Sequence, residues 1–438
     1  MHKVITLLSV CIFISFTGLS QSQNIILLDN WDNDTLPLDP YNSTFNECWG
    51  FVYNNQEYAV MGSTVGTHIF KITATNQLEE IQFLPGNIDW AIHRDYHDYN
   101  NILYGVSDEE PGLDIMDMST LPDSLTRTKD TVQFNNTHNI FIDSATATMY
   151  CCDASMTDIF TIAGPDSLIP KAPYGLPSFD YVHDIYARRD TLFMNSSLYG
   201  LCYIDMGAPA PVINSLEFYP DKGYNHSGWL SDDGLVYVFA DETAGKSVKV
   251  CDASDWSDIQ VTAQIMPSTF DSTMAHNLML KDNLLFISYY YDGLQVYDIS
   301  DIYNPVRVAY YDTYQGPDST VFEGAWGVYC YLPSGRILVS DRHNGLFLLE
   351  MDIPSSITNL NSKDLKIETH PNKFVLNFSN YDEKLIRVFS QSGQLIFEKT
   401  TTDQAFSIDN SSWSAGTYIY QITGEQFGIN GKLIKADN

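Results

Sequence analysis

The chain has 438 residues and a formal net charge of −32, from 55 acidic and 23 basic side chains. So large an excess of negative charge repels nucleic acids and anionic lipid surfaces, and it argues against both as partners. Hydrophobic residues make up 44% of the chain and aromatic residues 13%, including 28 Tyr and 23 Phe. Aromatic side chains pack well on pleated sheets, so the composition predicts a sizeable core built from β-structure.

The chain begins with a pattern typical of a secretory signal peptide. Lys3 precedes an apolar run from Val4 to Phe16, and the small residues Gly18 and Ser20 follow it. We therefore expect residues 1–20 to be a signal peptide that is removed on export. The apolar run is too short to span a membrane, and no later stretch reaches 18 apolar residues, so we expect no membrane span in the mature protein.

One passage recurs seven times along the chain and predicts the fold. Five consecutive copies open with a histidine, and Trp49 and Trp326 take the histidine's place in the first and last copies; the histidines are His93, His138, His183, His226 and His276. Subtracting these numbers gives spacings of 44, 45, 45, 43, 50 and 50 residues. Each copy reads as four short strands. This period, with four strands per unit, predicts a seven-bladed β-propeller over residues 23–354.

The last copy lacks a fourth strand, while a lone strand precedes the first copy. The last copy ends after Leu346–Asp352, and Asn24–Trp31 resembles the fourth strands of the other copies. Because proteins avoid open sheet edges, we predict that Asn24–Trp31 completes the last sheet and brings Ile26 and Leu28 close to Phe347 and Leu349.

The pattern changes near residue 355. A polar linker over residues 355–364 leads to short alternating strands with glycine turns, which predict a small β-sandwich over residues 365–438. From Ile357 onward there are 8 basic and 9 acidic residues, whereas Val4–Ser356 holds 46 acids and 14 bases. Two domains of different character are therefore expected.

The C-terminal segment resembles the sorting domain of type IX secretion, which some Gram-negative bacteria use. The similarity rests on His370–Asn372, Val388–Ile396, Ser414–Ile422 and Gly431–Lys435, and His370 stands where that family usually has tyrosine. The resemblance implies transport across the outer membrane by the type IX machinery, after which the protein is released or fixed to the cell surface.

The repeats are similar to the choice-of-anchor B family, which has LVIVD-type repeats. The segments that carry this likeness are Tyr224–Gly234, Phe239–Thr243, Ile287–Ser300, Gly324–Tyr329 and Leu332–Gly335. The family implies a shared body with varying surface anchors, and it brings no established activity.

Six cysteines remain after the predicted signal peptide: Cys48, Cys151, Cys152, Cys202, Cys251 and Cys330. An exported protein can form disulfides, but these residues are scattered over different repeats and show no C-x-x-C spacing. We favour buried thiols, with one or two bridges as the alternative.

The first strand of each propeller blade lines the central channel, so the five histidines should form an arc around its mouth. We expect neighbouring loops to add Asp108, Glu109, Glu110, Asp153, Asp158, Asp241, Glu242, Asp292, Asp341 and His343. Imidazoles among carboxylates suit zinc, iron or copper, with His138, His183 and His226 as candidate ligands, whereas carboxylates alone suit calcium. The alternative is structural: a histidine in nearly every repeat bonds to the backbone of the next blade, and the acidic loops are solvated turns.

No G-x-S-x-G, H-E-x-x-H or phosphate-binding glycine loop occurs in the sequence. Tyr199, Tyr289, Tyr290 and Tyr291 are suited to stacking on sugars or to packing between blades. We therefore predict a secreted or cell-surface binding or adhesion module, with a surface polysaccharide or an extracellular protein as its partner. A metal-dependent hydrolase or oxidoreductase that uses the histidines is the alternative.

Overall fold

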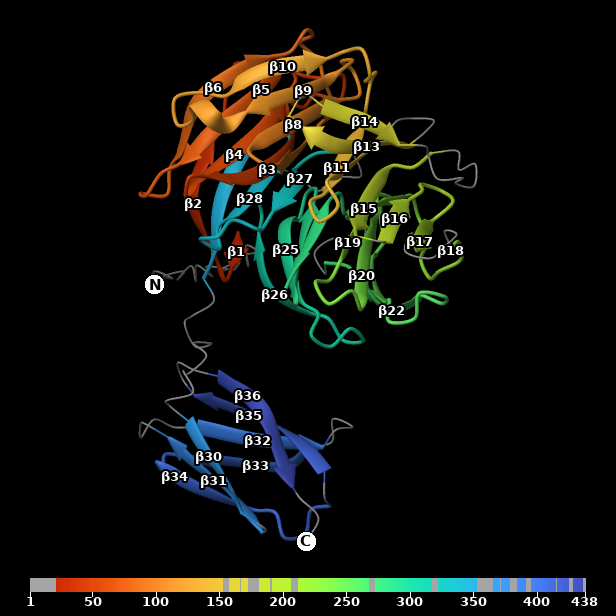
Figure 1. Cartoon of the computed structure of the whole chain (residues 1–438). Coiled ribbons are helices and arrows are strands. Elements are labelled where there is room, and N and C mark those ends of the chain that lie inside the picture. Colours follow the sequence, from red (N-terminus) through yellow and green to blue (C-terminus); the bar gives the residue numbers. More distant parts are fainter. Residues whose placement is uncertain are drawn as a thin grey trace, which may run out of the picture. The chain divides into compact units, whose positions relative to one another are not determined.

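The chain forms two compact units, Met1–Met351 and Asp352–Asn438, which Figure 1 draws in a computed structural model. The structure describes residues 21–152, 157–165, 167–171, 181–189, 191–205, 212–267, 272–316, 322–352, 365–370, 372–378, 384–390, 395–414, 416–424 and 428–435. The predicted signal peptide, the predicted linker and Asp153 lie outside these residues. The all-β prediction is confirmed: within the described residues the one helix is a short 3-10 turn, η1 (Met118–Thr120). No helix in the described part is long and apolar enough to cross a membrane.

Seven separate antiparallel sheets are formed by the described residues of the first unit. The first three are β3 (Phe45–Tyr53), β4 (Gln56–Ser63), β5 (Gly66–Ile72) and β6 (Leu78–Pro85); β7 (Arg94–Tyr99), β8 (Ile102–Ser107), β9 (Leu113–Asp117) and β10 (Thr126–Asp130); and β11 (Asn139–Asp143), β12 (Thr148–Cys152), β13 (Thr157–Gly164) and β14 (Ser167–Lys171). The next two are β15 (Asp184–Arg188), β16 (Thr191–Asn195), β17 (Leu201–Asp205) and β18 (Val212–Leu216); and β19 (Asn225–Leu230), β20 (Val236–Asp241), β21 (Val248–Asp252) and β22 (Gln260–Ile265). The last two are β23 (Leu278–Lys281), β24 (Leu284–Tyr289), β25 (Gly293–Asp298) and β26 (Val306–Tyr311), with β1 (Ser22–Gln23) added at the edge; and β27 (Ala325–Tyr329), β28 (Ile337–Asp341) and β29 (Gly345–Met351), joined by β2 (Ile25–Trp31).

The first strands of the seven sheets follow one another in a closed series. Each of β3, β7, β11, β15, β19 and β23 contacts the first strand of the next sheet, and β27 contacts β3 again. The starts of strands far apart in the sequence are thereby brought together at one place.

The predicted pairing of the N-terminal strand with the last repeat is confirmed. β2 runs antiparallel to β29, with Leu27 opposite Leu349 and Asn30 opposite Phe347. A bulge between Leu27 and Asp29 shifts the register, and Leu28 packs against the core. β1 pairs with β26 of the preceding sheet, so one N-terminal segment joins two sheets.

The apolar core lies between sheets. Each hydrophobic cluster draws its side chains from consecutive sheets; one, for example, joins Val60 of β4 to Leu103 of β8, and another joins Leu192 of β16 to Tyr150 of β12. The largest cluster joins the sixth, seventh and first sheets and closes the series. All six cysteines in the described residues are buried thiols, as the thiol interpretation predicted.

The second unit has its own core. β30 (Leu365–His370), β31 (Lys373–Phe378) and β34 (Ala405–Asp409) form one sheet, and β33 (Leu395–Thr401), β32 (Lys384–Ser390), β35 (Gly416–Gly424) and β36 (Gly428–Lys435) form the other. Phe374 and Leu376 of β31 share one hydrophobic cluster with Ile386 and Ile422 of the second sheet.

The β2–β29 pairing predicts a specific effect of glycine substitution. Gly345 and Gly335 both have positive φ, +80° and +83°. A Cβ on Gly345 would overlap the carbonyl oxygen of Trp31 in β2, whereas nothing lies within 4 Å of one on Gly335. We expect Gly335→Ala to cost about 1 to 2 kcal/mol of backbone strain, and Gly345→Ala to cost more because β2 must move. Thermal melting of both variants measures this, and equal losses would contradict the placement of β2.

Candidate functional site: a ring of histidines

Five histidines from five consecutive sheets lie ring against ring. Successive ring centroids are 5.0, 4.4, 3.9 and 4.4 Å apart along the series His93, His138, His183, His226 and His276. Trp326 lies 3.9 Å from His276 and 5.8 Å from His93. The expected arc is therefore a closed ring of six side chains.

The repeat places these histidines through one shared backbone contact. Four of the five histidines stand just before the first strand of their sheet. In three of them the backbone amide of the histidine donates to a carbonyl near the end of the second strand. The pairs are His138 to Cys152 at 2.8 Å, His183 to Asn195 at 2.8 Å and His276 to Ser288 at 2.9 Å. Because the sheets share this backbone contact, the histidine side chains lie at the same level.

The prediction that Trp49 takes the histidine's place in the first copy is wrong. Trp49 pairs with Val60 of β4, in line with His97, which pairs with Tyr104 of β8. The ring centroids of Trp49 and His97 are 4.4 Å apart. Both residues lie within their first strands, whereas His93 precedes its strand. A bulge between Phe45 and Cys48 lengthens this strand, which a count of residues does not reveal.

The ring nitrogens Nδ1 of four histidines face hydrogen-bond acceptors. His93 Nδ1 lies 2.9 Å from Glu109 Oε1, and His138 Nδ1 lies 2.8 Å from Asp108 Oδ2. His183 Nδ1 lies 3.2 Å from the carbonyl of His226, and His276 Nδ1 lies 2.8 Å from the carbonyl of Trp326. The last two bonds reach the backbone of the next sheet, as the structural alternative predicted.

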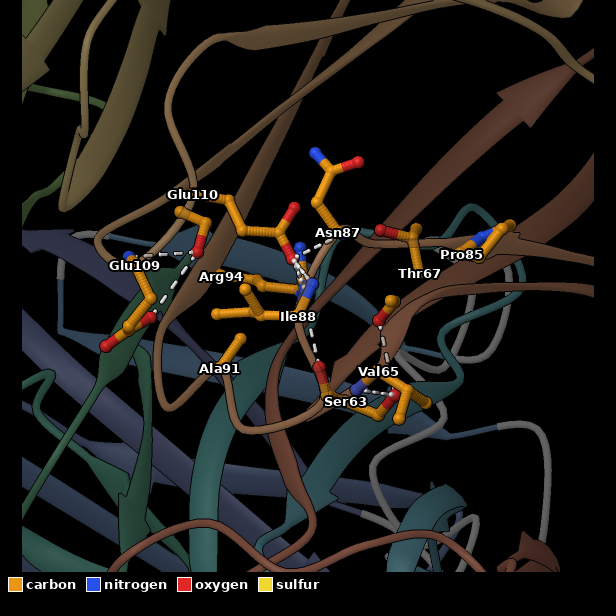
Figure 2. Close-up of polar contacts among 12 residues, drawn as sticks. Ser63, Val65, Thr67, Pro85, Asn87, Ile88, Ala91, Arg94, Glu109 and Glu110 are labelled. Carbon is orange, nitrogen blue, oxygen red and sulfur yellow. Dashed lines mark hydrogen bonds and ion pairs between the residues drawn. The ribbon is translucent and has the colours of Figure 1, made fainter.

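A buried ion pair holds the acidic loop beside His93 and His138. Figure 2 shows Arg94, which donates to Glu110 Oε1 at 2.8 Å and to the carbonyl of Ser63 at 2.9 Å. Glu110 also accepts from the amide of Asn87 at 3.0 Å. Arg94 and Glu110 are buried, so this bridge fixes the turn that presents Asp108 and Glu109 to the histidines.

The histidine ring lines a cavity of about 180 Å³. Its other walls come from the N-terminal segment, from segments just before first strands and from loops that follow second strands: Tyr41; Ile92 and Phe322; and Glu242, Tyr290 and Arg342, respectively. The hydroxyl of Tyr290 donates to Glu242 Oε1, and the other carboxylate oxygen of Glu242 lies 3.6 Å from His226 Nε2. Arg342 pairs with Asp39 at 2.7 Å and lies over the Trp326 ring, 4.6 Å from its centroid.

Burial sets the protonation of this cavity. It lowers the pKa of His183, His226 and His276 well below the ordinary range, and neighbouring imidazoles lower those of His183 and His226 further. Burial raises the pKa of Glu242 to about 7 against the bond from Tyr290. At Asp108 burial acts to raise the pKa, but the hydrogen bond and charge of His138 outweigh it and lower that pKa.

Below the ring lies a level of buried carboxylates that the sequence analysis did not identify. Glu47 and Asp95 line a smaller space directly beneath the histidines, and with Asp184 they line the next one along the channel. Burial raises the pKa of Asp95 to about 7 and those of Glu47 and Asp184 well above the ordinary range. The sequence does contain one indication of these carboxylates, because Asp184 directly follows His183 and Asp95 follows His93 by two residues.

Several predicted loop acids do not line the cavity. Asp241 pairs with Lys249 at 2.8 Å, Asp292 accepts from the Thr273 hydroxyl, and Asp341 accepts from Thr313 at 2.7 Å. Asp158 stands on β13, opposite Cys151. These residues close loops and pair strands, as turn residues do. Tyr289, Tyr290 and Tyr291 are buried, and of these Tyr290 alone lines the cavity.

In the part of the chain that the structure describes, two groups of side chains have donor atoms close enough together to hold a metal ion. They are His93, Asp108 and His138, and His183, His226 and Glu242; within each group the donor atoms lie within 4.8 Å of one another. The predicted ligands His138, His183 and His226 are thus brought together but divided between the two groups.

Residues 362–436 match a family described as the secretion system C-terminal sorting domain. This match shows that the protein is exported by the type IX system to the cell surface or the extracellular space. No curated protein matches the chain.

Solved structures with similar folds share little sequence with this chain. U3-55K has 9% identity and a TM-score of 0.52 over 75% of this chain and 98% of that chain. The extracellular domain of a hybrid two-component system of B. thetaiotaomicron has 11% identity and a TM-score of 0.49, covering 90% of this chain and 57% of that chain. PorZ, described as an essential bacterial surface component of the type-IX secretion system of Porphyromonas gingivalis, has 7% identity and a TM-score of 0.47, covering 89% and 59%. At these identities the likeness to U3-55K shows a shared fold alone, and the other two are too distant to argue from.

The carboxylate level predicts a pH effect on stability. A carboxyl group whose pKa is raised on folding stabilises the protein below its unfolded pKa and loses that contribution as pH rises through the folded value. We expect the melting temperature of the parent to fall relative to Glu47→Gln as pH rises above the ordinary range of a glutamate carboxyl, because the amide stays neutral. Glu57→Gln is the control, since Glu57 pairs with Arg336 at 3.1 Å. A constant difference between the parent and Glu47→Gln would contradict the prediction.

The sorting domain predicts the outcome of truncation. The two units have separate cores, so removing residues 365–438 should leave the first unit folded but not exported across the outer membrane. Cell fractionation and thermal melting of the truncated chain test the two parts separately. Secretion equal to that of the full chain would contradict the role of the tail.

Proposed function

We propose that this chain is a secreted or cell-surface seven-bladed β-propeller that acts as a binding module and takes its ligand in the histidine cavity. The closed series of first strands supports the propeller. The domain limits that we propose are residues 23–354 for the propeller and 365–438 for the sorting domain, joined by a linker over residues 355–364.

One observation carries the binding role: five histidines from five sheets converge with Trp326 on a single cavity. A structural role explains the Nδ1 bonds of His183 and His276 to the next sheet, but it does not require the opposite ring edges to share a cavity with Glu242 and Arg342. The convergence of charged, polar and aromatic side chains is typical of ligand sites.

The dimensions of the cavity limit what it can take. Its volume of about 180 Å³ is below the roughly 300 to 1,000 Å³ of pockets for drug-sized ligands. It therefore suits one end group of a larger partner, or an ion with a few waters. Tyr41 and Phe322 are 55% and 38% exposed at its edge, and their rings meet at 6.2 Å. An aromatic edge above polar groups favours a surface polysaccharide over an extracellular protein as the partner.

A metal-dependent hydrolase or oxidoreductase is the second candidate function. Both donor groups combine two histidines with one carboxylate, a set that non-haem iron enzymes use. We place binding first because catalysis requires, in addition, a bound ion with an open coordination position.

The binding role predicts a difference between two exposed tyrosines. Tyr41 lines the cavity, whereas Tyr303, 63% exposed, lies in the β25–β26 turn at the opposite end of its sheet. We expect Tyr41→Ala to weaken binding about tenfold, since an aromatic contact is worth about 1 kcal/mol or more, and Tyr303→Ala to have no effect. Affinity of the full chain for a panel of bacterial surface polysaccharides measures this. A parent that binds no polysaccharide, or equal losses in both variants, would refute the proposal.

A further inference from the structure

We propose that the histidine ring binds one divalent transition-metal ion, copper in preference to zinc, through His138, His183, His226 and Glu242. The inference deepens the proposed function, because the ion would occupy the same cavity.

The Nδ1 contacts determine which nitrogen each histidine offers. A carbonyl or carboxylate oxygen only accepts, so the Nδ1 atoms of His138 and His183, which face Asp108 and the carbonyl of His226, must carry protons. In the neutral ring the other nitrogen, Nε2, then has a free lone pair. Metal-binding histidines are usually held in this way, with the second ring nitrogen donating to a carboxylate or a backbone carbonyl.

Two of these lone pairs face each other. His138 Nε2 lies 2.9 Å from His183 Nε2, a hydrogen-bond distance at which two bare nitrogens repel. A positive species must therefore sit between or beside them, either a shared proton or a metal ion. Two nitrogens 2.9 Å apart can both lie about 2.0 to 2.1 Å from one ion that is placed off the line joining them.

Further donors adjoin His183. The donor atoms of His183, His226 and Glu242 lie within 4.8 Å of one another. Tyr290 holds one oxygen of Glu242 and leaves the other 3.6 Å from His226 Nε2. His183 is the member that both observations share. The four side chains of the proposed set, three imidazoles and one carboxylate, are all partly or fully buried.

The donor chemistry selects the ion. Imidazole suits zinc, copper, iron and nickel, whereas calcium and magnesium take oxygen ligands, which only Glu242 supplies in this set. At a given site with nitrogen and oxygen ligands, Cu²⁺ binds more tightly than the other divalent ions of the first transition row, including Zn²⁺. The net charge of −32 adds a general attraction for cations.

The test uses the untagged, exported full chain, stripped with a chelator and titrated calorimetrically with Cu²⁺, Zn²⁺ and Ca²⁺. We expect one Cu²⁺ per chain with a Kd below about 1 µM, weaker Zn²⁺ binding and no Ca²⁺ binding. The electron paramagnetic resonance spectrum of the Cu²⁺ form should show coupling to nitrogen.

Three variants locate the ion. His183→Ala should weaken Cu²⁺ binding at least about 100-fold and Glu242→Gln about tenfold. His68→Ala is the matched control, because His68 is also buried and bonds a carboxylate, Glu80 at 2.8 Å, but lies outside the ring. If His183→Ala does not fold, Glu242→Gln and the nitrogen coupling still decide the result.

Absence of Cu²⁺ binding in the parent would overturn the inference and leave the shared proton as the occupant. So would undiminished Cu²⁺ binding in both His183→Ala and Glu242→Gln, or Ca²⁺ binding as tight as that of Cu²⁺. Polysaccharide binding by the metal-stripped protein and its Tyr41→Ala variant is measured separately, so failure of the metal site and failure of the binding role can be told apart.

Discussion

Burial of apolar side chains between consecutive sheets is the interaction on which the first unit depends. The clusters pass from each sheet to the next, and the largest joins the seventh sheet back to the first. Burying one such side chain contributes about 1.5 to 3 kcal/mol, whereas an exposed ion pair contributes about 0 to 1 kcal/mol. Because the apolar faces are used between sheets, the starts of the first strands are free to carry polar groups. The histidine ring and the buried carboxylates are placed there.

Those polar groups are held by bonds that also join the sheets. His183 and His276 each donate to a carbonyl of the next sheet, and Asp95 accepts from the amide of Ile140 at 2.8 Å, again across two sheets. Buried polar networks of this kind are costly unless their members are satisfied, and they fix orientation when they are. The structural and the binding interpretations of the histidines are therefore compatible, since bonding by Nδ1 is what turns Nε2 toward the cavity.

The sequence pattern succeeded where the physical signal was periodic and failed where the exact position along a strand mattered. Trp49 fits a spacing of 44 residues, yet it lies inside β3, paired with Val60, and stands beside His97 instead of in the ring. Asp241 and Glu242 are neighbours in the sequence, but Asp241 pairs with Lys249 while Glu242 lines the cavity. Arg342 and Glu47 belong to no recurring pattern, and composition alone did not point to them.

The sequence by itself determined the all-β class, the strands of each repeat, the pairing of the N-terminal strand with the last repeat and the sorting tail. The alternation of polar and apolar side chains, the recurrence of one passage and a strand without a partner can all be recognised in the sequence itself. Only the tertiary structure decided that the histidines close a ring with Trp326, that His138 and His183 meet at Nε2, and that Glu242 lies beside His183 and His226. The contacts between the rings join residues at least 43 positions apart, and their distances depend on how neighbouring sheets pack.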